Sequence, residues 1–368
     1  MGVSPRFRTR GPVRGLVAAA AAALVLTAAT GCGARVAGKA VEAAGDTASP
    51  SPTGSGSTGG GSKPTGSPSP TKPRLVPTDA EAISLLKALD VSPKTASGEL
   101  DEAEAAKRLA EPMLSVVKAS WRIAKPSFRI SGGMPTPYQP RVYRPAPSAN
   151  GDRWFVIADG EPDLSEDRFI YVFRATAADP AWKLAMTTIL VENQPFPGID
   201  EDASGLAQVV ASPSGLATDP AAVCAQLAQP EKQRGVTWGP NQSKADRQVA
   251  ELIAQQARQS VSAKVAREVR PEAVGPVWRT PTGGAMVPCV LTNKWTNTVV
   301  DGRPPMEWNG KSRYKAETPG FRVTSFVDTN IGMSLVWIPP AAGAAATTPD
   351  VAADVVYPLD FTYQKAKS

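Results

Sequence analysis

Histidine is absent from the 368 residues of this sequence. Without an imidazole, neither a Ser-His-Asp triad nor a Cys-His pair can form, because both use the imidazole as general base. Zinc and haem sites with a histidine ligand are excluded as well, and so is a pH switch based on histidine. Because no other complete catalytic set takes the place of these sites, we expect a non-catalytic protein that uses no cofactor and no metal ion.

Acidic residues are missing before Glu42, whereas the first 15 residues contain four arginines. An apolar run follows at residues 16–29, and it is shorter than the roughly 20 residues that a comfortable transmembrane helix needs. A basic start, a short apolar run and small residues after it are typical of a secretory signal peptide. We predict such a signal over residues 1–31.

The end of the predicted signal resembles the lipobox of bacterial lipoproteins, since residues 26–32 read Leu-Thr-Ala-Ala-Thr-Gly-Cys. Ala29 is a mild departure, because leucine is commoner at that place. The resemblance implies that Cys32 receives a diacylglycerol thioether and becomes the first residue of the mature chain. A diacylglycerol supplies two acyl chains, and stable anchoring takes more than one. We therefore expect Cys32 to hold the chain in membrane lipid, on the outer, extracytoplasmic face of the cytoplasmic membrane.

Bulky aliphatic residues are missing between Val41 and Leu75, in a stretch rich in proline, serine, glycine and threonine. Such a segment buries too little apolar surface to offset its ordering entropy, so we predict a disordered tether over residues 32–74. Its end-to-end distance should be about 35 Å, and about 140 Å when it is fully extended. That reach suits a spacer that lifts a folded region off the membrane.

The excess of basic residues is confined to the N-terminal region. Nine of the 40 Lys and Arg residues and two of the 34 Asp and Glu residues precede Leu75, which leaves 31 basic and 32 acidic residues in the rest of the chain. Nucleic-acid binding requires a concentrated basic surface. The remaining net charge of −1 gives no reason to expect such a partner.

Residues 75–368 are long for one domain, and their hydrophobic periodicity changes twice from helical to alternating. We predict a first α+β domain at 75–215 and a second at 216–368. In the first we expect a helix that begins at the capping box Thr78/Glu81, a helix at 101–120 interrupted by Pro112, and strands at 154–157, 169–173 and 182–191. In the second we expect helices at 219–229 and, capped by Ser243, at 244–267, and strands at 277–279, 286–294, 322–327, 331–338 and 354–363.

The predicted fold class is α+β, with two tandem domains that each pack an N-terminal helix on a curved antiparallel sheet. This arrangement resembles the cone-shaped cystatin-like and nuclear-transport-factor-like folds, which host many functions. Residues 142–144 and 277–279 read Val-Tyr-Arg and Val-Trp-Arg, which leaves an internal duplication open.

Two cysteines remain after Cys32, and they are Cys224 and Cys289. An extracytoplasmic compartment permits a disulfide between them, which closes a loop of about 65 residues and stabilises by up to about 4 kcal/mol in the chain-entropy model. Two separate buried thiols are the alternative, because free cysteine behaves as a small apolar residue.

Several sets of polar residues resemble parts of catalytic or metal sites, and none is complete. Two Ser-x-x-Lys pairs and a Ser-x-Asn resemble penicillin-binding enzymes, but the third element, Lys-Thr-Gly, is missing. Two acidic clusters lack the spacing of a calcium loop, so we interpret both as solvated loops. These groups are Ser84/Lys87, Ser115/Lys118, Ser148/Asn150, the acidic residues of 161–167 and those of 200–202.

The lipobox, the tether and three short motifs resemble a family of uncharacterised lipoproteins of high-GC Gram-positive bacteria; the motifs lie at residues 153–157, 181–184 and 280–285. That resemblance implies no activity and no functional residues. We expect a membrane-anchored binding or scaffolding module whose partner is an envelope protein or a cell-wall component. The alternatives are an envelope enzyme that uses carboxylates or Ser/Lys chemistry and, third, a transporter's solute-binding subunit, which the clustering of strands opposes.

Overall fold

The structure is a computed structural model, and it describes residues 77–89, 95, 98–124, 134–135, 137, 139–144, 151–159, 168–191, 196–259, 263–273, 275–307, 322–341 and 348–366. The predicted signal peptide, Cys32 and the predicted tether lie outside these residues. So do Ser148, Asn150 and the acidic residues at 161–167.

Three short helices open the described part of the chain. Helix α1 (Asp79–Lys87) begins with the expected capping box, in which the side chain of Thr78 accepts from the Glu81 amide and the Glu81 carboxylate accepts from the Thr78 amide. Helices α2 (Glu102–Arg108) and α3 (Met113–Ala124) replace the single helix expected at 101–120. The break falls at Pro112, as predicted from its lack of an amide proton.

A four-stranded antiparallel sheet follows, in the order β1-β2-β3-β4. The strands expected around residues 154–157, 169–173 and 182–191 are confirmed. The bounds are Pro140–Tyr143 for β1, Arg153–Asp159 for β2, Phe169–Ala175 for β3 and Lys183–Ile189 for β4.

A second antiparallel sheet is built from long strands in the order β10-β9-β7-β5, and we call it the long sheet. Its strands are β5 (Ala263–Ala273), β7 (Ala285–Val299), β9 (Arg322–Ile338) and β10 (Asp350–Lys365). Two short strands, β6 (Trp278–Arg279) and β8 (Met306–Glu307), pair with β7 and β9. The two strands expected at 322–327 and 331–338 are one continuous strand, because β9 pairs along its whole length with β7 or β10.

Of the two helices in the second half, the first lies where it was expected and the second differs from its prediction at both ends. Helix α4 (Pro220–Ala228) lies where expected, and a 3-10 turn (Glu231–Gln233) follows. Helix α5 (Pro240–Gln259) begins before Ser243 and ends before the predicted residue 267. Residues 263–267 instead pair with β7 as part of edge strand β5. The two valines of this strand, Val265 and Val269, are four residues apart, a spacing that also fits the helical period.

The two sheets share one hydrophobic core. Leu86, Leu109 and Phe155 of the first half belong to the same buried cluster as Met286, Ile331 and Met333 of the long sheet. The end of the first sheet also reaches β10, where the Val191 amide donates to the Ala352 carbonyl. The α+β class is therefore confirmed, but a tandem pair of cystatin-like or nuclear-transport-factor-like domains is not.

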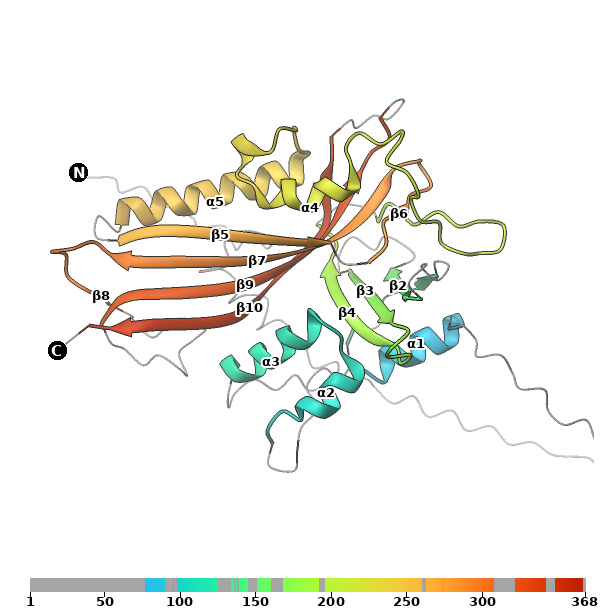
Figure 1. The fold of residues 1–368 in the computed structure, drawn as a ribbon, viewed down its shortest axis with the longest axis horizontal. Coiled ribbons are helices and arrows are strands. Elements are labelled where there is room, and N and C mark those ends of the chain that lie inside the picture. Colours follow the sequence, from blue (N-terminus) through green and yellow to red (C-terminus); the bar gives the residue numbers. More distant parts are fainter. Residues whose placement is uncertain are drawn as a thin grey trace, which may run out of the picture.

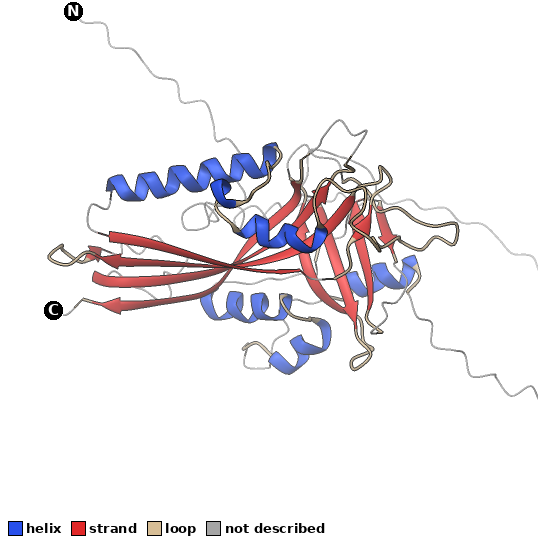
Figure 2. Cartoon of the chain, turned by 45° about the horizontal axis from the view of Figure 1, so that its top comes forward, coloured by secondary structure: helices blue, strands red, loops and turns tan. Residues whose placement is uncertain are grey.

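The long sheet separates two groups of helices. Helices α4 and α5 lie on one side of it, and α2 and α3 lie on the other (Figures 1 and 2). A second core forms between α4 and the sheet, from Val223 and Leu227 against Val287 and Val336. Cys224 of α4 and Cys289 of β7 form a disulfide across this core, with Cα atoms 5.4 Å apart.

Candidate functional site: the amide–aromatic face of the long sheet

The side of the long sheet that carries Cys289 changes in character along its strands. Near the disulfide this face presents Leu291, Val287 and Val336, which pack under α4. Residues two apart on a strand share a face, so the same side continues along β7 through Asn293, Trp295 and Asn297. The face therefore turns from aliphatic to polar and aromatic as it leaves the disulfide.

The register of the four strands places these residues in three rows across the sheet. Because β7 and β9 pair without a register shift, the residues opposite each other lie on one face. The rows, from β5 to β10, are Val269, Asn293, Asn330 and Pro358; Arg267, Trp295, Asp328 and Phe361; and Val265, Asn297, Phe326 and Tyr363. We call the last two rows, together with Asn293 and Asn330, the amide–aromatic face.

Three polar residues of this face are almost fully buried. The exposed fractions are 1% for Asn330, 3% for Asp328 and 6% for Asn297. Burying an amide or a carboxylate is costly unless it is hydrogen-bonded, and asparagine is a poor strand former. A merely structural core at this place would more readily be aliphatic, as it is around Val287.

The clustering of asparagine is unusual for this chain. The sequence has seven asparagines in 368 residues, and Asn293, Asn297 and Asn330 are three of them. Departures from local sequence rules tend to mark functional or strained sites. The alternation Asn293-Lys294-Trp295-Thr296-Asn297 carries this signal in the sequence. It was missed because the strand was expected to end at Lys294.

Aromatic rings occupy the part of the face farthest from the disulfide. The ring of Phe361 lies 5.7 Å from that of Phe326 and 6.0 Å from that of Tyr363, between centroids. Phe361 is buried, whereas Phe326, Tyr363 and Trp295 keep part of their surface exposed. The rings thus form a partly accessible apolar cluster next to buried amides.

Arg267 links the aromatic and amide groups. Its guanidinium lies 5.2 Å from the Trp295 ring centroid, and its Nη2 donates to the Asn293 side-chain oxygen at 2.6 Å. Burial of the guanidinium lowers the pKa of Arg267, although the residue as a whole is exposed, and Asp246 of α5 acts in the opposite direction. This single cation accompanies a single carboxylate, Asp328, so the charges of the face balance.

Helix α5 is fixed on this side of the sheet by a cap from another strand. The Asp350 carboxylate of β10 accepts from the amides of Gln242, at 2.9 Å, and Asn241, at 3.2 Å. These are the second and third residues of α5, whose amides have no partner inside a helix. Gly239 precedes the helix and leaves room for Asp350, because a Cβ there would lie 2.5 Å from the Asp350 Cγ.

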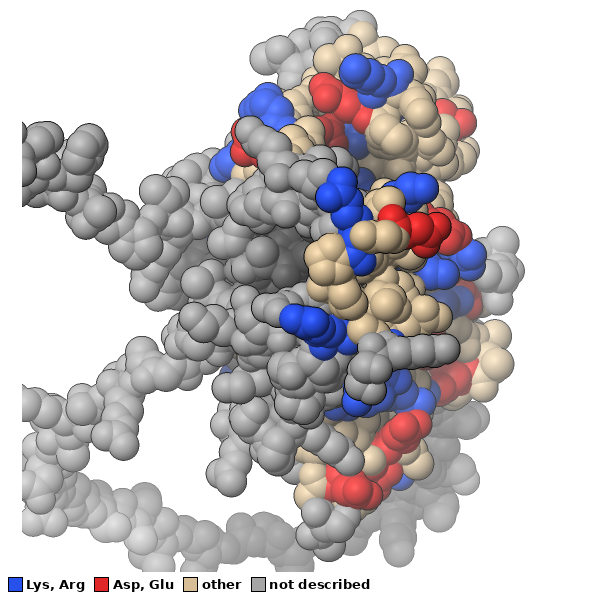
Figure 3. Space-filling model, turned by 90° about the vertical axis from the view of Figure 1, so that its left-hand side faces the viewer, with Lys and Arg blue, Asp and Glu red and all other residues tan. Residues whose placement is uncertain are grey.

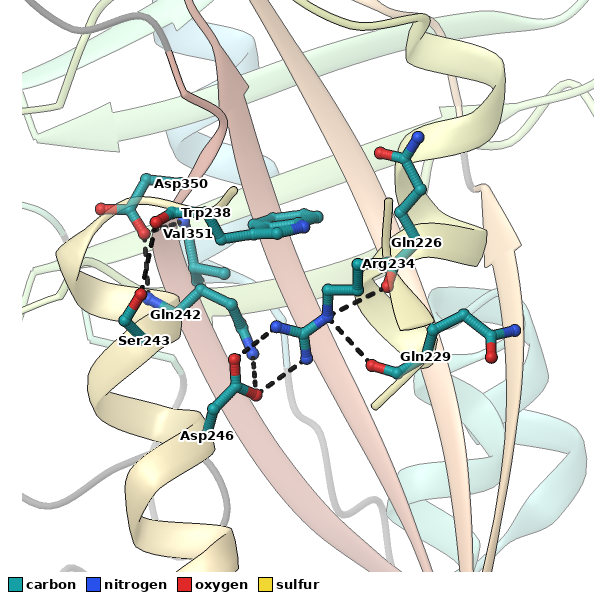
Figure 4. Close-up of polar contacts among 9 residues, drawn as sticks. All are labelled: Gln226, Gln229, Arg234, Trp238, Gln242, Ser243, Asp246, Asp350 and Val351. Carbon is teal, nitrogen blue, oxygen red and sulfur yellow. Dashed lines mark hydrogen bonds and ion pairs between the residues drawn. The ribbon is translucent and has the colours of Figure 1, made fainter. Parts of the chain in front are cut away.

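A buried arginine joins α5 to α4 (Figure 4). Arg234 is 6% exposed, and its guanidinium makes two contacts with the Asp246 carboxylate, one of them at 2.8 Å. Its Nε donates to the carbonyls of Gln226 and Gln229 at the end of α4, at 3.2 and 2.9 Å. The guanidinium also lies 5.6 Å from the Trp238 ring centroid. Since α4 is in turn tied to β7 by the disulfide, the whole helical layer is anchored to the sheet.

Asp354 is another buried carboxyl group, and it lies beside the disulfide on the same side of the long sheet as Asp328. Asp354 of β10 is opposite Ser334 of β9, which is opposite Cys289 of β7. Burial raises the pKa of Asp354 to about 7, while the hydrogen bond from Ser334 lowers it. Asp350 also has a raised pKa, for which burial is the main cause. Both carboxyl groups are engaged in contacts within the fold.

The Ser/Lys pairs expected from the sequence are placed on helices. Ser84 and Lys87 belong to α1, and Ser115 and Lys118 belong to α3. Lys118 forms an ion pair of 2.7 Å with Glu102. The second pair therefore has its amine engaged in a surface contact between α2 and α3.

The acidic cluster at residues 200–202 forms a turn. The Asp202 carboxylate accepts from the amides of Ser204 and Leu206, and Arg141 pairs with Glu201 at 2.7 Å. Among the described residues no group of three Asp, Glu or Cys side chains is arranged to hold a metal ion.

The charged surface is mixed in sign. Over the described part of the end shown in Figure 3, Lys and Arg are interspersed with Asp and Glu, without a region of one sign. No helix in the described part of the chain is long and apolar enough to cross a membrane.

Together these observations define an α+β protein in which a long antiparallel sheet carries an amide–aromatic face beside an anchored helical layer. The chain belongs to a family described as a domain of unknown function, DUF8094, whose sequence profile matches residues 76–355. The match spans the described helices and nearly all of both sheets and begins after the predicted tether. No curated protein and no solved structure matches the chain.

Proposed function

We propose that the protein is a lipid-anchored, extracytoplasmic lipoprotein and that its folded region is a non-catalytic binding or scaffolding module of the cell envelope. Three buried polar residues beside partly exposed aromatic rings, on one face of the long sheet, support the binding role most strongly. Binding sites typically combine aromatic surface with a few fixed polar groups. The basic start, the short apolar run and the lipobox-like residues before Cys32 support the anchor.

The anchor is tested by fractionating cells that express the full chain or its Cys32→Ser variant. We expect the wild-type chain in the membrane fraction, with an N-terminal diacylated Cys32 in its mass spectrum, and the variant without acyl chains. Equal membrane retention of an unacylated wild-type chain would contradict lipid anchoring.

The binding role is tested by in-cell cross-linking, affinity purification and mass spectrometry. We expect a reproducible envelope partner, either a protein or a cross-linked wall fragment, that is lost when residues 75–368 are replaced by an unrelated folded domain. The partner should be kept when the tether at 32–74 is exchanged for another of equal length. Failure to capture any partner above the replaced-domain background counts against the module.

An envelope enzyme is the weaker alternative. Its best candidates in the described part of the chain are the carboxyl groups with raised pKa, Asp350 and Asp354. Asp350 caps α5, and Asp354 accepts from Ser334 in the interior. These contacts favour structural roles for both groups.

A further inference from the structure

We propose that the Cys224–Cys289 disulfide is a redox latch for the helical layer of α4 and α5, and that Asp354, when ionised, protects this disulfide from reduction. The inference goes beyond the proposed function, because it concerns how the fold opens and does not depend on a ligand. It comes from the position of the bridge between helix and sheet, and from a buried carboxyl group in the same cross-strand row.

The disulfide is the covalent tie between the helical layer and the long sheet, since it bonds Cys224 of α4 to Cys289 of β7. Helix α4 has only nine residues, and a helix of that length depends on tertiary contacts for its stability. It holds α5 through Arg234, which donates to carbonyls at the end of α4 and pairs with Asp246 of α5. Cleavage of the bridge should therefore loosen α4 and, through Arg234, α5.

Asp354 and the bridge lie in one row across three strands. Asp354 of β10 is opposite Ser334 of β9, which is opposite Cys289 of β7, on the same face of the sheet. Side chains directly opposite each other have Cβ atoms about 4.5–5.5 Å apart, so Ser334 lies between the carboxyl group and the sulfur. The exposed fractions are 9% for Asp354, 3% for Ser334 and 0% for Cys289. Since buried charges are poorly screened, a charge on Asp354 acts on Cys289.

Reduction of the bridge passes through a thiolate. When α4 opens locally, a thiolate of a dithiol reductant attacks the Cys224 sulfur rather than the fully buried Cys289. The S–S bond breaks, and the Cys289 sulfur leaves with the electron pair. The second thiolate of the reductant then attacks the mixed disulfide and releases Cys224. The reductant becomes a disulfide, and the two protons that it gives up neutralise the two cysteine thiolates.

An ionised Asp354 opposes this leaving group in two ways. Its negative charge repels the developing thiolate of Cys289. It also holds the single hydroxyl proton of Ser334, at an O···O distance of 2.7 Å, which could otherwise be donated to the sulfur. Burial raises the pKa of Asp354 to about 7. The bridge is therefore protected at a pH above this value and open to reduction below it.

Other charged groups do not replace Asp354 beside the bridge. Burial, the hydrogen bond from Ser334 and one from the Val355 amide determine its pKa. On the described elements packed against β10, Asp328 lies three rows away on the same face, and the remaining charged residues pair elsewhere or are exposed. The pairs are Lys118/Glu102, Arg122/Asp360, Lys183/Asp179 and Arg234/Asp246, and the exposed residues are Lys244, Arg247, Glu251 and Arg322.

The test measures how fast dithiothreitol reduces the bridge in the lipidated mature chain in detergent, with the freed thiols trapped by alkylation and counted by mass spectrometry. At about pH 8.5 we expect Asp354→Asn to be reduced about fivefold faster than the wild type, and at about pH 5.5, where Asp354 is protonated, at the same rate. The exposed Asp301→Asn is the control and should match the wild type at both pH values. Comparison at one pH cancels the ionisation of the reductant.

Reduction through global unfolding gives the opposite result. Asp354→Asn removes a buried carboxylate, so at about pH 8.5 it should be the more stable protein, and its bridge would be reduced more slowly if the reductant reached only the unfolded chain. A slower or unchanged rate for Asp354→Asn at this pH overturns the protective role of Asp354. So does a wild-type bridge that dithiothreitol leaves intact at both pH values.

Hydrogen exchange of the oxidised and the reduced wild type tests the latch itself. After reduction we expect faster exchange of the amides of α4 and α5 and unchanged protection of β1 to β4, and the same pattern in Cys224→Ala/Cys289→Ala without reductant. Unchanged exchange in α4 and α5, or loss of protection in both sheets together, overturns the latch. No ligand or partner takes part in these measurements, so their failure leaves the proposed binding function standing.

Discussion

The hydroxyl group of Ser334 donates a hydrogen bond of 2.7 Å to the carboxyl group of Asp354, and both side chains are buried on neighbouring strands of the long sheet. Burial raises the pKa of this carboxyl group from 3.8 to about 7. The folded protein therefore holds a proton on Asp354 at acidities where the unfolded chain has released it.

This relationship predicts a pH-dependent stability. Between about pH 4 and pH 7 the folded state binds more protons than the unfolded state, so the Asp354 contribution is favourable at low pH and is lost as the pH rises through 7. Asp354→Asn, which keeps an acceptor oxygen and carries no charge, should remove this dependence. We expect the variant to be more stable than the wild type at about pH 8.5, by about 2–4 kcal/mol, and similar at about pH 5.

Urea unfolding of both proteins at the two pH values measures the difference. The exposed Asp301→Asn is the control, since it removes a carboxylate from the surface. If the wild type and Asp354→Asn show the same difference in stability between the two pH values, the Asp354 carboxyl group titrates normally.

Arg234 is predicted to be important for the stability of the helical layer. Arg234→Met removes the guanidinium from the Asp246 carboxylate, which keeps only the side-chain amide of Gln242 as a donor, and from two carbonyls at the end of α4. Because breaking a buried ion pair strands the remaining charge, the free energy of unfolding should fall by about 3 kcal/mol. Arg234→Lys should lose less, since it keeps the charge but not the fork of donors.

A double-mutant cycle isolates the ion pair itself. Arg234→Met combined with Asp246→Leu should be less destabilised than the sum of the two single variants, because neither charge is then left alone. Strict additivity of the two losses in thermal or urea unfolding would mean that the two side chains do not interact.

The disulfide is predicted to carry a large share of the stability of the helical layer. Cys224 and Cys289 are 65 residues apart, and closing such a loop stabilises by about 4 kcal/mol in the chain-entropy model. A reductant should lower the unfolding midpoint of the wild type and leave that of the Cys224→Ala/Cys289→Ala variant unchanged. An equal response of both proteins to the reductant would contradict a formed bridge.

The N-terminal half of the fold could be predicted closely from the sequence. The capping box at Thr78 and Glu81 and the break at Pro112 depend on contacts within a few residues, and both features are in the structure. The short strands β2, β3 and β4 were expected for the same reason, since their apolar runs are local signals.

The second half was harder because its decisive contacts are distant in sequence. The cap of α5 comes from Asp350, more than 100 residues after Gln242, and no local pattern specifies this contact; the expected cap, Ser243, instead lies inside the helix. In the structure the Ser243 hydroxyl donates to the Trp238 carbonyl, inside the first turn. The local signals for this helix start are Gly239 and Pro240, because proline is favoured at the first position of a helix. The prediction overlooked them.

The amide–aromatic face depends in the same way on register. Asn293 and Asn330 are opposite each other only because β7 and β9 pair in one register, and no local pattern specifies that pairing. Period-two alternation in β7 marks Asn293, Trp295 and Asn297 as one side of a strand. The side of β7 that faces α4 and α5 depends on how β7 pairs with β5 and β9, which the alternation alone does not specify.

The trans cap of α5 gives the last prediction. Asp350→Ala removes the acceptor for the amides of Asn241 and Gln242, so it should cost about 1–2 kcal/mol, as the loss of a helix cap does. Asp350→Asn keeps one acceptor oxygen and should cost less. Gly239→Ala should also destabilise the wild type, because its Cβ meets the Asp350 carboxylate.

The two sites are therefore coupled. In the Asp350→Ala background the carboxylate is gone, so Gly239→Ala should cost much less than it does in the wild type. Urea unfolding of the four proteins gives the coupling free energy directly, and helix content by circular dichroism reports whether α5 frays. If Gly239→Ala costs the same in both backgrounds, the close approach of Asp350 to Gly239 is not what constrains this position.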